Sequence, residues 1–195
     1  MKHYYTNNDD LESNEQTFTY NYDKYNLLFT TDNGVFSKQM IDYGSRVILD
    51  NVTLDGAKSL LDVGCGYGTF GVCFKKRYKQ LEVDMVDVND RAMKLASHNA
   101  KMNNVEVNIF KSNAYENVEK SYDVIITNPP IRAGKQVVTN ILVNSYEHLN
   151  KDGKIYVVIQ KKQGAPSAKK KLTEVFGNCE VVKRDKGYYL LVSKK

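Results

Sequence analysis

The chain has 195 residues, of which 42% are hydrophobic and 26% are charged, and its formal net charge is +5. This size and composition fit one folded globular domain and exclude a disordered or fibrous chain. No stretch reaches the apolar length of a membrane span, and the polar N-terminus lacks the apolar core of a signal peptide. The three cysteines and three histidines are scattered. We therefore expect a cytoplasmic protein with free thiols, no metal site and no membrane partner.

The N-terminal quarter predicts a tail, a hairpin and a helix. Residues 1–16 are polar and are expected to form a flexible tail. Aromatic and polar residues then alternate on both sides of Asp23 and Lys24, which predicts a β-hairpin. Ser37 is expected to cap a helix over residues 38–52, where apolar residues recur at helical spacing.

From Ser59 onward the apolar patterns of strands and helices alternate. Strands are expected at 59–63, 82–88, 105–110, 123–127, 154–160, 179–184 and 187–193, with helices at 69–78, 90–103, 136–149 and 168–176. Asp90 is expected to cap the second of these helices. This order predicts an α/β, Rossmann-like fold with a seven-stranded, mostly parallel sheet and helices on both faces. The short turn before the last strand makes the C-terminal pair antiparallel. An N-terminal hairpin and helix extend this core.

The loop after the first of these strands is rich in glycine. Two patterns compete in it: Gly66, Gly68 and Gly71 fit the GxGxxG pattern of dinucleotide sites, whereas Gly64, Gly66 and Gly68 fit GxGxG behind Asp62. Glycines at such a turn let a ligand approach the main chain. The second pattern suits a cofactor without phosphates, because a carboxylate at this point repels a pyrophosphate and attracts a cation.

The next strand ends in Asp87, which follows the loop by about twenty residues. An acidic residue at this place accepts both hydroxyls of a ribose, and Val88 beside it is suited to pack on an adenine. A ligand with an adenosyl group, an amino acid tail and a positive charge fits these residues, and S-adenosylmethionine is such a ligand. A tight turn without any ligand is the simpler alternative.

The stretch "DVIITNPPIRAGK", residues 123–135, ends a buried strand in an unusual way. Two prolines cannot donate to a sheet, so Pro129 and Pro130 stop the strand directly after Asn128. A plain strand-ending turn and a rigid functional segment are both compatible with this pattern.

At this point the chain resembles the class I S-adenosylmethionine-dependent methyltransferases. The segments that carry the resemblance are "LLDVGCGYGTFG", "VDMVDVNDRAM", "KSNAY" and "DVIITNPPI". Together with the upstream block "DNGVFSKQMIDYGSRVIL", they are similar to the guanine-N2 methyltransferases of small-subunit ribosomal RNA of the RsmC type. Longer enzymes of that type carry a second methyltransferase-like domain before the catalytic one, and we expect this chain to correspond to the catalytic domain alone.

The resemblance implies catalytic roles for Asn128, Pro129, Pro130 and Ile131. The side-chain oxygen of Asn128 and the carbonyl of Pro129 are expected to accept hydrogen bonds from a planar exocyclic amine. Ile131 stands where the family usually has an aromatic residue that stacks on the base, and Phe36 is a candidate replacement.

The binding residues follow from the glycine-rich loop, from this resemblance and from the position of the basic side chains. The expected cofactor-binding residues are Asp62, Gly64, Cys65, Gly66, Gly68, Asp87, Val88, Asn113, Ala114 and Asn128. The expected substrate-binding residues are Phe36 and the basic residues Arg132, Lys135, Lys161 and Lys162. The positive charges of these four residues, at the carboxyl edge of the sheet, suit RNA phosphates.

We therefore expect one methyltransferase domain over residues 1–195, with a tail at 1–16, a substrate-side extension at 17–56 and a cofactor-binding core at 57–195. The expected partner is ribosomal RNA or the small ribosomal subunit, and the expected state is a monomer or a weak homodimer. Methylation of adenine N6, methylation of a protein glutamine amide and a non-catalytic RNA-binding module remain alternatives. An NAD-dependent oxidoreductase is the last alternative, but it gives the Asn-Pro-Pro stretch no role.

Overall fold

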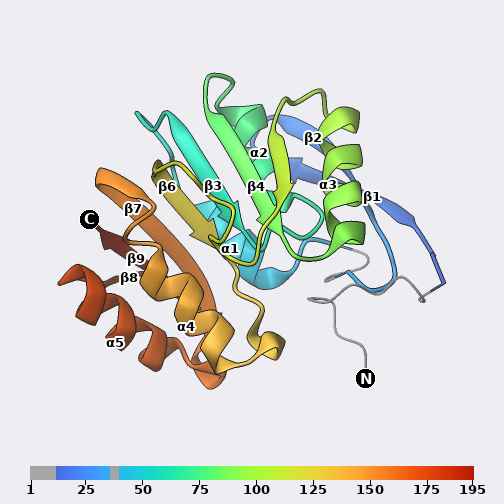
Figure 1. Cartoon of the computed structure of the whole chain (residues 1–195). Coiled ribbons are helices and arrows are strands. Elements are labelled where there is room, and N and C mark those ends of the chain that lie inside the picture. Colours follow the sequence, from blue (N-terminus) through green and yellow to red (C-terminus); the bar gives the residue numbers. More distant parts are fainter. Residues whose placement is uncertain (1–11, 36–39) are drawn as a thin grey trace.

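The computed structural model describes residues 12–35 and 40–195. Its strands are β1 (Gln16–Tyr22), β2 (Tyr25–Thr31), β3 (Ser59–Val63), β4 (Glu82–Asp87), β5 (Asn108–Lys111), β6 (Tyr122–Thr127), β7 (Leu149–Gln160), β8 (Glu180–Asp185) and β9 (Tyr188–Lys194). Seven of them form one sheet in the order β5-β4-β3-β6-β7-β9-β8, and β1 and β2 form a separate hairpin (Figure 1). The predicted fold class is confirmed.

The direction of each strand follows from the length of its connection. Strands β3 to β7 run parallel because helices or long loops carry the chain back between them. Strand β9 lies between β7 and β8 and is antiparallel to both. The turn between β8 and β9, after Asp185, is too short for the crossover that a parallel pair requires. The parallel strands therefore end together at one edge of the sheet, which is where α/β folds bind ligands.

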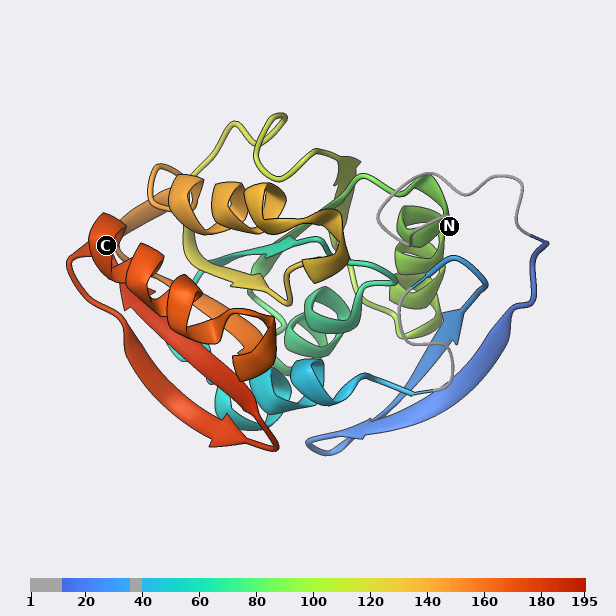
Figure 2. The same cartoon turned by 90° about the horizontal axis from the view of Figure 1, so that it is seen from below.

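Among the described residues, five α-helices cover the sheet in two layers. They are α1 (Tyr43–Asn51), α2 (Thr69–Arg77), α3 (Asp90–Met102), α4 (Lys135–Asn144) and α5 (Ala165–Phe176). Helices α1 to α3 and the hairpin β1–β2 pack on one face of the sheet, and α4 and α5 pack on the other (Figures 1 and 2). The loop after β5 contributes the buried Tyr115 and Val118 to the second face, where no helix follows that strand.

Helix α1 begins later than the sequence pattern predicts. It starts at Tyr43, with Asp42 as its N-cap, and the Asp42 carboxylate accepts the N–H of Ser45 at 3.1 Å. The expected cap, Ser37, lies outside the described residues. Met40 and Ile41 are not helical, because the carboxylate of Asp42 satisfies the N-terminal N–H groups at this point.

Two further helix ends differ from expectation. Helix α3 is capped by Asn89, whose side-chain oxygen accepts the N–H of Ala92 at 3.1 Å, and the expected cap Asp90 instead pairs with Lys111 at 2.9 Å. Helix α4 ends at Asn144, where the Ser145 hydroxyl turns back to a carbonyl of the helix. Strand β5 is also shorter than predicted.

Asn99 of α3 and Asn103, the C-cap of that helix, attach the hairpin to the core. Asn99 accepts the N–H of Thr30 at 2.8 Å and donates to its carbonyl at 2.9 Å. Asn103 accepts the N–H of Leu28 at 3.0 Å and donates to its carbonyl at 2.7 Å. Asn99 also donates to the carbonyl of Tyr67 in the glycine-rich loop at 2.9 Å. The hairpin is therefore tied to the loop that borders the functional site.

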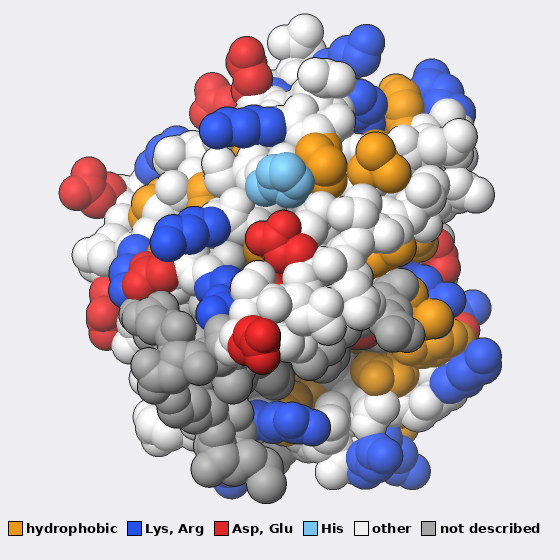
Figure 3. All heavy atoms as spheres, turned by 90° about the vertical axis from the view of Figure 1, so that its right-hand side faces the viewer, with side chains coloured by type: hydrophobic (Ala, Val, Ile, Leu, Met, Phe, Trp, Pro, Cys, Tyr) orange, Lys and Arg blue, Asp and Glu red, His pale blue; other side chains and the backbone are white. Residues whose placement is uncertain are grey.

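The outer face over α3 and the hairpin carries basic and acidic side chains interspersed with one another (Figure 3). Within residues 12–35 and 40–195, no helix is both long enough and apolar enough to cross a bilayer.

Candidate active site

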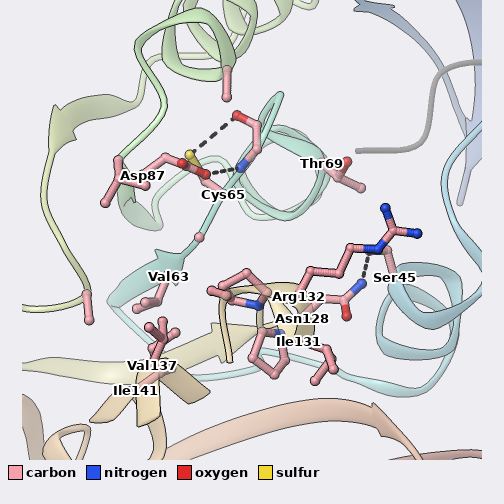
Figure 4. Close-up of a pocket in the computed structure, with 18 of the residues that line it drawn as sticks. Ser45, Val63, Cys65, Thr69, Asp87, Asn128, Ile131, Arg132, Val137 and Ile141 are labelled. Carbon is pink, nitrogen blue, oxygen red and sulfur yellow. Dashed lines mark hydrogen bonds between the residues drawn. The ribbon is translucent and has the colours of Figure 1, made fainter. Parts of the chain in front are cut away.

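A cavity of about 630 Å³ opens at the carboxyl ends of the parallel strands (Figure 4). Its walls come from the loop after β3, the end of β4, the loop after β5 and the segment after β6, with α1 closing one side. At this edge the chain leaves the sheet after each parallel strand and continues as a loop or helix. The space between these connections is where α/β folds bind ligands.

The glycine-rich loop uses its own N–H groups internally. The N–H groups of Gly64 and Cys65 donate to the carbonyl of Val86 at 2.9 and 3.0 Å, and that of Gly66 donates to the Asp87 carboxylate at 2.8 Å. A phosphate-binding loop needs such groups to be available for the ligand. The geometry therefore favours a cofactor without phosphates and disfavours the dinucleotide interpretation of the loop.

Asp87 joins the loop to the end of β4. Its second carboxylate oxygen accepts the N–H of Asn89 at 2.9 Å, and burial raises the pKa of this carboxyl. Each carboxylate oxygen has two acceptor sites, so Asp87 retains acceptor capacity toward the cavity that it lines. It is placed to receive a pair of hydroxyl groups.

The loop after β5 forms the far end of the cavity. Asn113 and Ala114 line it together with Val88, and the Asn113 amide nitrogen donates to the Glu116 carboxylate at 2.8 Å. Since a carboxylate only accepts, this bond leaves the Asn113 side-chain oxygen as an acceptor for a ligand. This end of the cavity combines an apolar wall with one acceptor, as an adenine amine requires.

The Asn-Pro-Pro segment follows β6 directly and forms the opposite end. Thr127 at the end of β6 donates through its hydroxyl to the carbonyl of Val63 at 2.9 Å, which fixes the ends of two neighbouring strands to each other. Pro129 is buried, and the carbonyl of Pro130 accepts the N–H of Ala133 at 2.9 Å in a single turn of 3₁₀-helix. The prolines fix their φ angles, so this backbone is rigid.

Asn128 is half-buried and points toward α1 (Figure 4). Its side-chain nitrogen donates to the carboxylate Oδ1 of Asp42 at 3.1 Å and to the hydroxyl of Ser45 at 3.2 Å. The side-chain oxygen of Asn128 is then the atom left for a ligand, and the acceptor role that the family resemblance implies for it stays a prediction.

Most predicted site residues lie around this cavity. Those that line it are Gly64, Cys65, Gly66, Asp87, Val88, Asn113, Ala114, Asn128, Pro129, Pro130, Ile131 and Arg132. Those that are described but do not line it are Asp62, Gly68, Lys135, Lys161 and Lys162. Phe36 lies outside the described residues. Other residues that line the cavity were not predicted from the sequence, among them Asp42, Ser45, Gln163 and Tyr188.

Asp62 lies below the glycine-rich loop and is fully buried. One of its oxygens accepts the N–H of Gly71 at 3.2 Å, and the other has no partner among the described residues. Burial, followed by the charge of Asp87, raises the pKa of this carboxyl to about 8. Asp62 therefore supports the loop from beneath, and its direct contact with a cofactor stays a prediction.

Cys65 is the one thiol that lines the cavity among the described residues. Its side chain is buried, and burial raises the pKa of the thiol well above its usual value. A thiol in this state is a poor nucleophile, so Cys65 acts as a small packing residue.

Comparisons with known proteins point to one family. The sequence model described as "Methyltransferase small domain" matches residues 26–192. The uncharacterised protein YbxB of Bacillus subtilis (strain 168) is 43% identical over 198 residues, which cover 100% of this chain and 98% of YbxB. The ribosomal RNA small subunit methyltransferase C of Psychromonas ingrahamii is 31% identical over 147 residues, which cover 73% of this chain and 42% of that protein. The chain thus spans less than half the length of that relative.

A solved structure has the same fold. It is the 16S ribosomal RNA guanine-N2 methyltransferase RsmC of T. thermophilus in complex with AdoMet and guanosine, with a TM-score of 0.84 and 21% identity. The match covers 93% of this chain and 50% of that one. The predicted resemblance is confirmed at the level of the family and the fold.

Proposed function

Because the chain belongs to the methyltransferase small domain family, its cofactor is S-adenosylmethionine, and we propose that it methylates an exocyclic amine of a base in ribosomal RNA. The target that we propose is guanine N2 of small-subunit RNA, because the T. thermophilus enzyme that shares this fold is named as a 16S ribosomal RNA guanine-N2 methyltransferase. A ribosomal RNA substrate places this activity in the cytoplasm.

The residues around the cavity fit this cofactor. Asp87 offers acceptors for the two ribose hydroxyls, and the side-chain oxygen of Asn113 offers one for the adenine amine. The main chain at Gly66 is open to the cavity, since a β-carbon added there would meet no atom within 4 Å. A cavity of about 630 Å³ is also of the size that small-molecule cofactors occupy.

The observation that carries the proposal is the orientation of Asn128. When bound, the cofactor supplies a methyl group on a positively charged sulfur. The amine of a base is a weak nucleophile because its lone pair is delocalised into the ring. The side-chain oxygen of Asn128 and the carbonyl of Pro129 accept the two amine hydrogens, which turns the lone pair toward the methyl group.

The rigidity of the segment matters for this role. The prolines prevent the Pro129 carbonyl from swinging away, and the bonds to Asp42 and Ser45 hold the Asn128 amide. S-adenosylmethionine, held by Asp87 and Asn113, would supply the methyl group and keep the electrons of its carbon–sulfur bond, and the methylated amine would release one proton to water. No strong base is needed before the attack.

Basic residues near the cavity suit the RNA backbone. Arg132 lines the cavity and is exposed, and Lys135, Lys161 and Lys162 are exposed on adjoining elements. We assign them to phosphate contacts. A target base must leave its stack to enter the cavity, and phosphate contacts hold the RNA on either side of that base.

The test is labelled methyl transfer to naked small-subunit RNA, to small subunits and to whole ribosomes, followed by nucleoside analysis. We expect N2-methylguanosine with the wild-type chain and at least about 100-fold less with Asn128→Ala, which still binds the cofactor. Asn140→Ala, a change at an exposed position of α4, is the matched control. Unchanged transfer by Asn128→Ala, or no methylated nucleoside from any substrate, contradicts the proposal.

A further inference from the structure

We infer that Asp42 selects guanine over adenine at the acceptor end of the cavity, which is the end formed by Asn128, Pro129 and Asp42. One carboxylate oxygen holds Asn128, and the other accepts the ring N1–H of the base. This inference rests on the proposed function and names the residue that decides which base is methylated.

Asp42 is fixed before any substrate binds. As the N-cap of α1, its Oδ1 accepts the N–H of Ser45 at 3.1 Å, and the backbone of Ser45 is buried in the first turn of that helix. The same oxygen accepts the Asn128 side-chain nitrogen at 3.1 Å. The side chain therefore sits between a rigid helix start and the rigid Asn-Pro-Pro segment.

The charge of Asp42 determines which way the Asn128 amide faces. An ionised carboxylate can only accept hydrogen bonds, so the Asn128 nitrogen must face Asp42. The hydroxyl of Ser45, at 3.2 Å from the same nitrogen, accepts its second hydrogen. The amide oxygen of Asn128 is then turned toward the cavity, and the neighbouring negative charge polarises the amide and strengthens this oxygen as an acceptor.

The second oxygen of Asp42 is available to a substrate. Asp42 lines the same cavity as Asn128, and no described residue donates a hydrogen bond to its Oδ2. A half-buried carboxylate oxygen without a partner is costly to desolvate, so a ligand that covers it must bring a donor. Three acceptors thus come together at this end of the cavity: Oδ1 of Asn128, the Pro129 carbonyl and Oδ2 of Asp42.

Guanine matches such a row of acceptors. Its Watson–Crick edge places the N1–H donor directly beside the exocyclic N2 amine, so the amine can meet Asn128 while N1–H meets Asp42. Adenine and cytosine place a ring nitrogen lone pair beside their amine, and a glutamine amide places a carbonyl oxygen there. Each of these would face the carboxylate with a second acceptor, which costs binding and transition-state stabilisation.

The variant Asp42→Asn separates the two roles of the side chain. Its remaining oxygen can still cap α1 and accept from Asn128, whereas its nitrogen replaces Oδ2 and presents a donor to the base. We expect methyl transfer to guanine to fall by about 100-fold and transfer to adenine in the same RNA context to rise. The affinity for S-adenosylmethionine, measured by calorimetry, and the melting temperature should stay close to those of the wild type.

Two further variants complete the experiment. Asp50→Asn makes the same change at an exposed position of the same helix and should leave the product unchanged. Asp42→Ser keeps a capping side chain that is too short to reach Asn128 and should lose transfer to both bases. The substrates are matched RNAs with guanine or adenine at the target position, and the methylated nucleosides are identified by mass spectrometry.

The outcomes distinguish this inference from the proposed function. If the wild type forms N2-methylguanosine and Asp42→Asn forms it equally fast, the inference fails and the proposed function stands. If the wild type forms N6-methyladenosine, the inference fails as well. A wild type that binds S-adenosylmethionine but methylates no RNA overturns the proposed function itself. A shift from guanine to adenine in Asp42→Asn is a result that a purely structural role of Asp42 would not produce.

Discussion

The two ends of the cavity are built in different ways. The cofactor end consists of loops that directly follow β3, β4 and β5, so each of its residues is placed by its own strand. The acceptor end joins Asn128 to Asp42 and Ser45, which are 86 and 83 residues away in the sequence. The first end is therefore a local product of the sheet edge, and the second exists only once α1 has packed against the core.

At both ends, a carboxylate holds the side-chain nitrogen of an asparagine. Glu116 holds the amide nitrogen of Asn113, and Asp42 holds that of Asn128, so each asparagine turns its oxygen toward the cavity. The pair at the cofactor end is exposed, whereas the pair at the acceptor end is partly buried. Because solvent screens exposed charges, the acceptor end should fix its amide more firmly.

The largest effect that should separate the two ends comes from Asp87→Ala. The variant loses the acceptor for the ribose hydroxyls and the partner of the Gly66 N–H. We expect the affinity for S-adenosylmethionine to fall on the order of 100-fold in calorimetry, with RNA affinity unchanged. Asp55→Ala, at an exposed turn before β3, is the control. An affinity within twofold of the wild type would mean that Asp87 does not belong to the cofactor end.

Gly71 of α2 and Gly66 of the glycine-rich loop should respond differently to substitution by alanine. An added methyl group at Gly71 overlaps Met85, so Gly71→Ala should lower the free energy of unfolding by about 1–3 kcal/mol. Gly66 has a φ of +55° and open space around its missing side chain. Gly66→Ala should cost only about 1 kcal/mol of stability but reduce cofactor affinity by roughly tenfold. Thermal unfolding and calorimetry on both variants check this, and equal losses of stability would contradict it.

A smaller effect concerns the pH dependence of stability. The Asp62 carboxyl has a pKa of about 8 in the folded chain and an ordinary value of 3.8 when exposed, so the folded state keeps a proton that the unfolded state loses. This contribution to the free energy of unfolding is complete below about pH 4 and is lost as the pH rises through about 8. Asp62→Asn should flatten that decline in denaturant titrations without cofactor. An identical slope in the variant would show that Asp62 ionises normally.

The smallest expected effect concerns the basic residues beside the acceptor end. Lys161→Ala and Lys162→Ala should each weaken RNA binding by about 2- to 5-fold and lower the slope of log affinity against log salt by about 1. Cofactor affinity should not change. Fluorescence anisotropy with labelled RNA at several salt concentrations measures both quantities, with the exposed Lys79→Ala as control. If RNA affinity falls no more than in the control variant, these lysines do not contact the RNA.

The sequence predicts the sheet and the cofactor end well because both depend on short-range patterns. The strand, the glycine-rich loop and Asp87 lie within 29 residues of Ser59, and the structure brings them to one wall of the cavity. The choice between the two glycine patterns needed the structure, because it depends on whether the N–H groups of the loop are already bonded.

The acceptor end was only half predicted. The Asn-Pro-Pro segment is visible in the sequence, but Asp42 and Ser45 act on it across α1 and carry no local signature of that role. The one available signal was the order Asp-x-x-Ser before an apolar run, which is typical of a helix N-cap. Lysines 161 and 162 looked like the informative part of their loop, yet the neighbouring Gln163 is the residue that lines the cavity.

The asparagine pair that holds the hairpin has a further consequence. Strand β2 exposes one edge toward α3, and a bare edge is a template for association with another chain. Asn99 and Asn103, one helical turn apart, pair with the N–H and carbonyl groups of Thr30 and Leu28 as a neighbouring strand would. Two primary amides thus imitate two peptide groups, and they leave this edge closed to the self-recognition by which β-proteins aggregate.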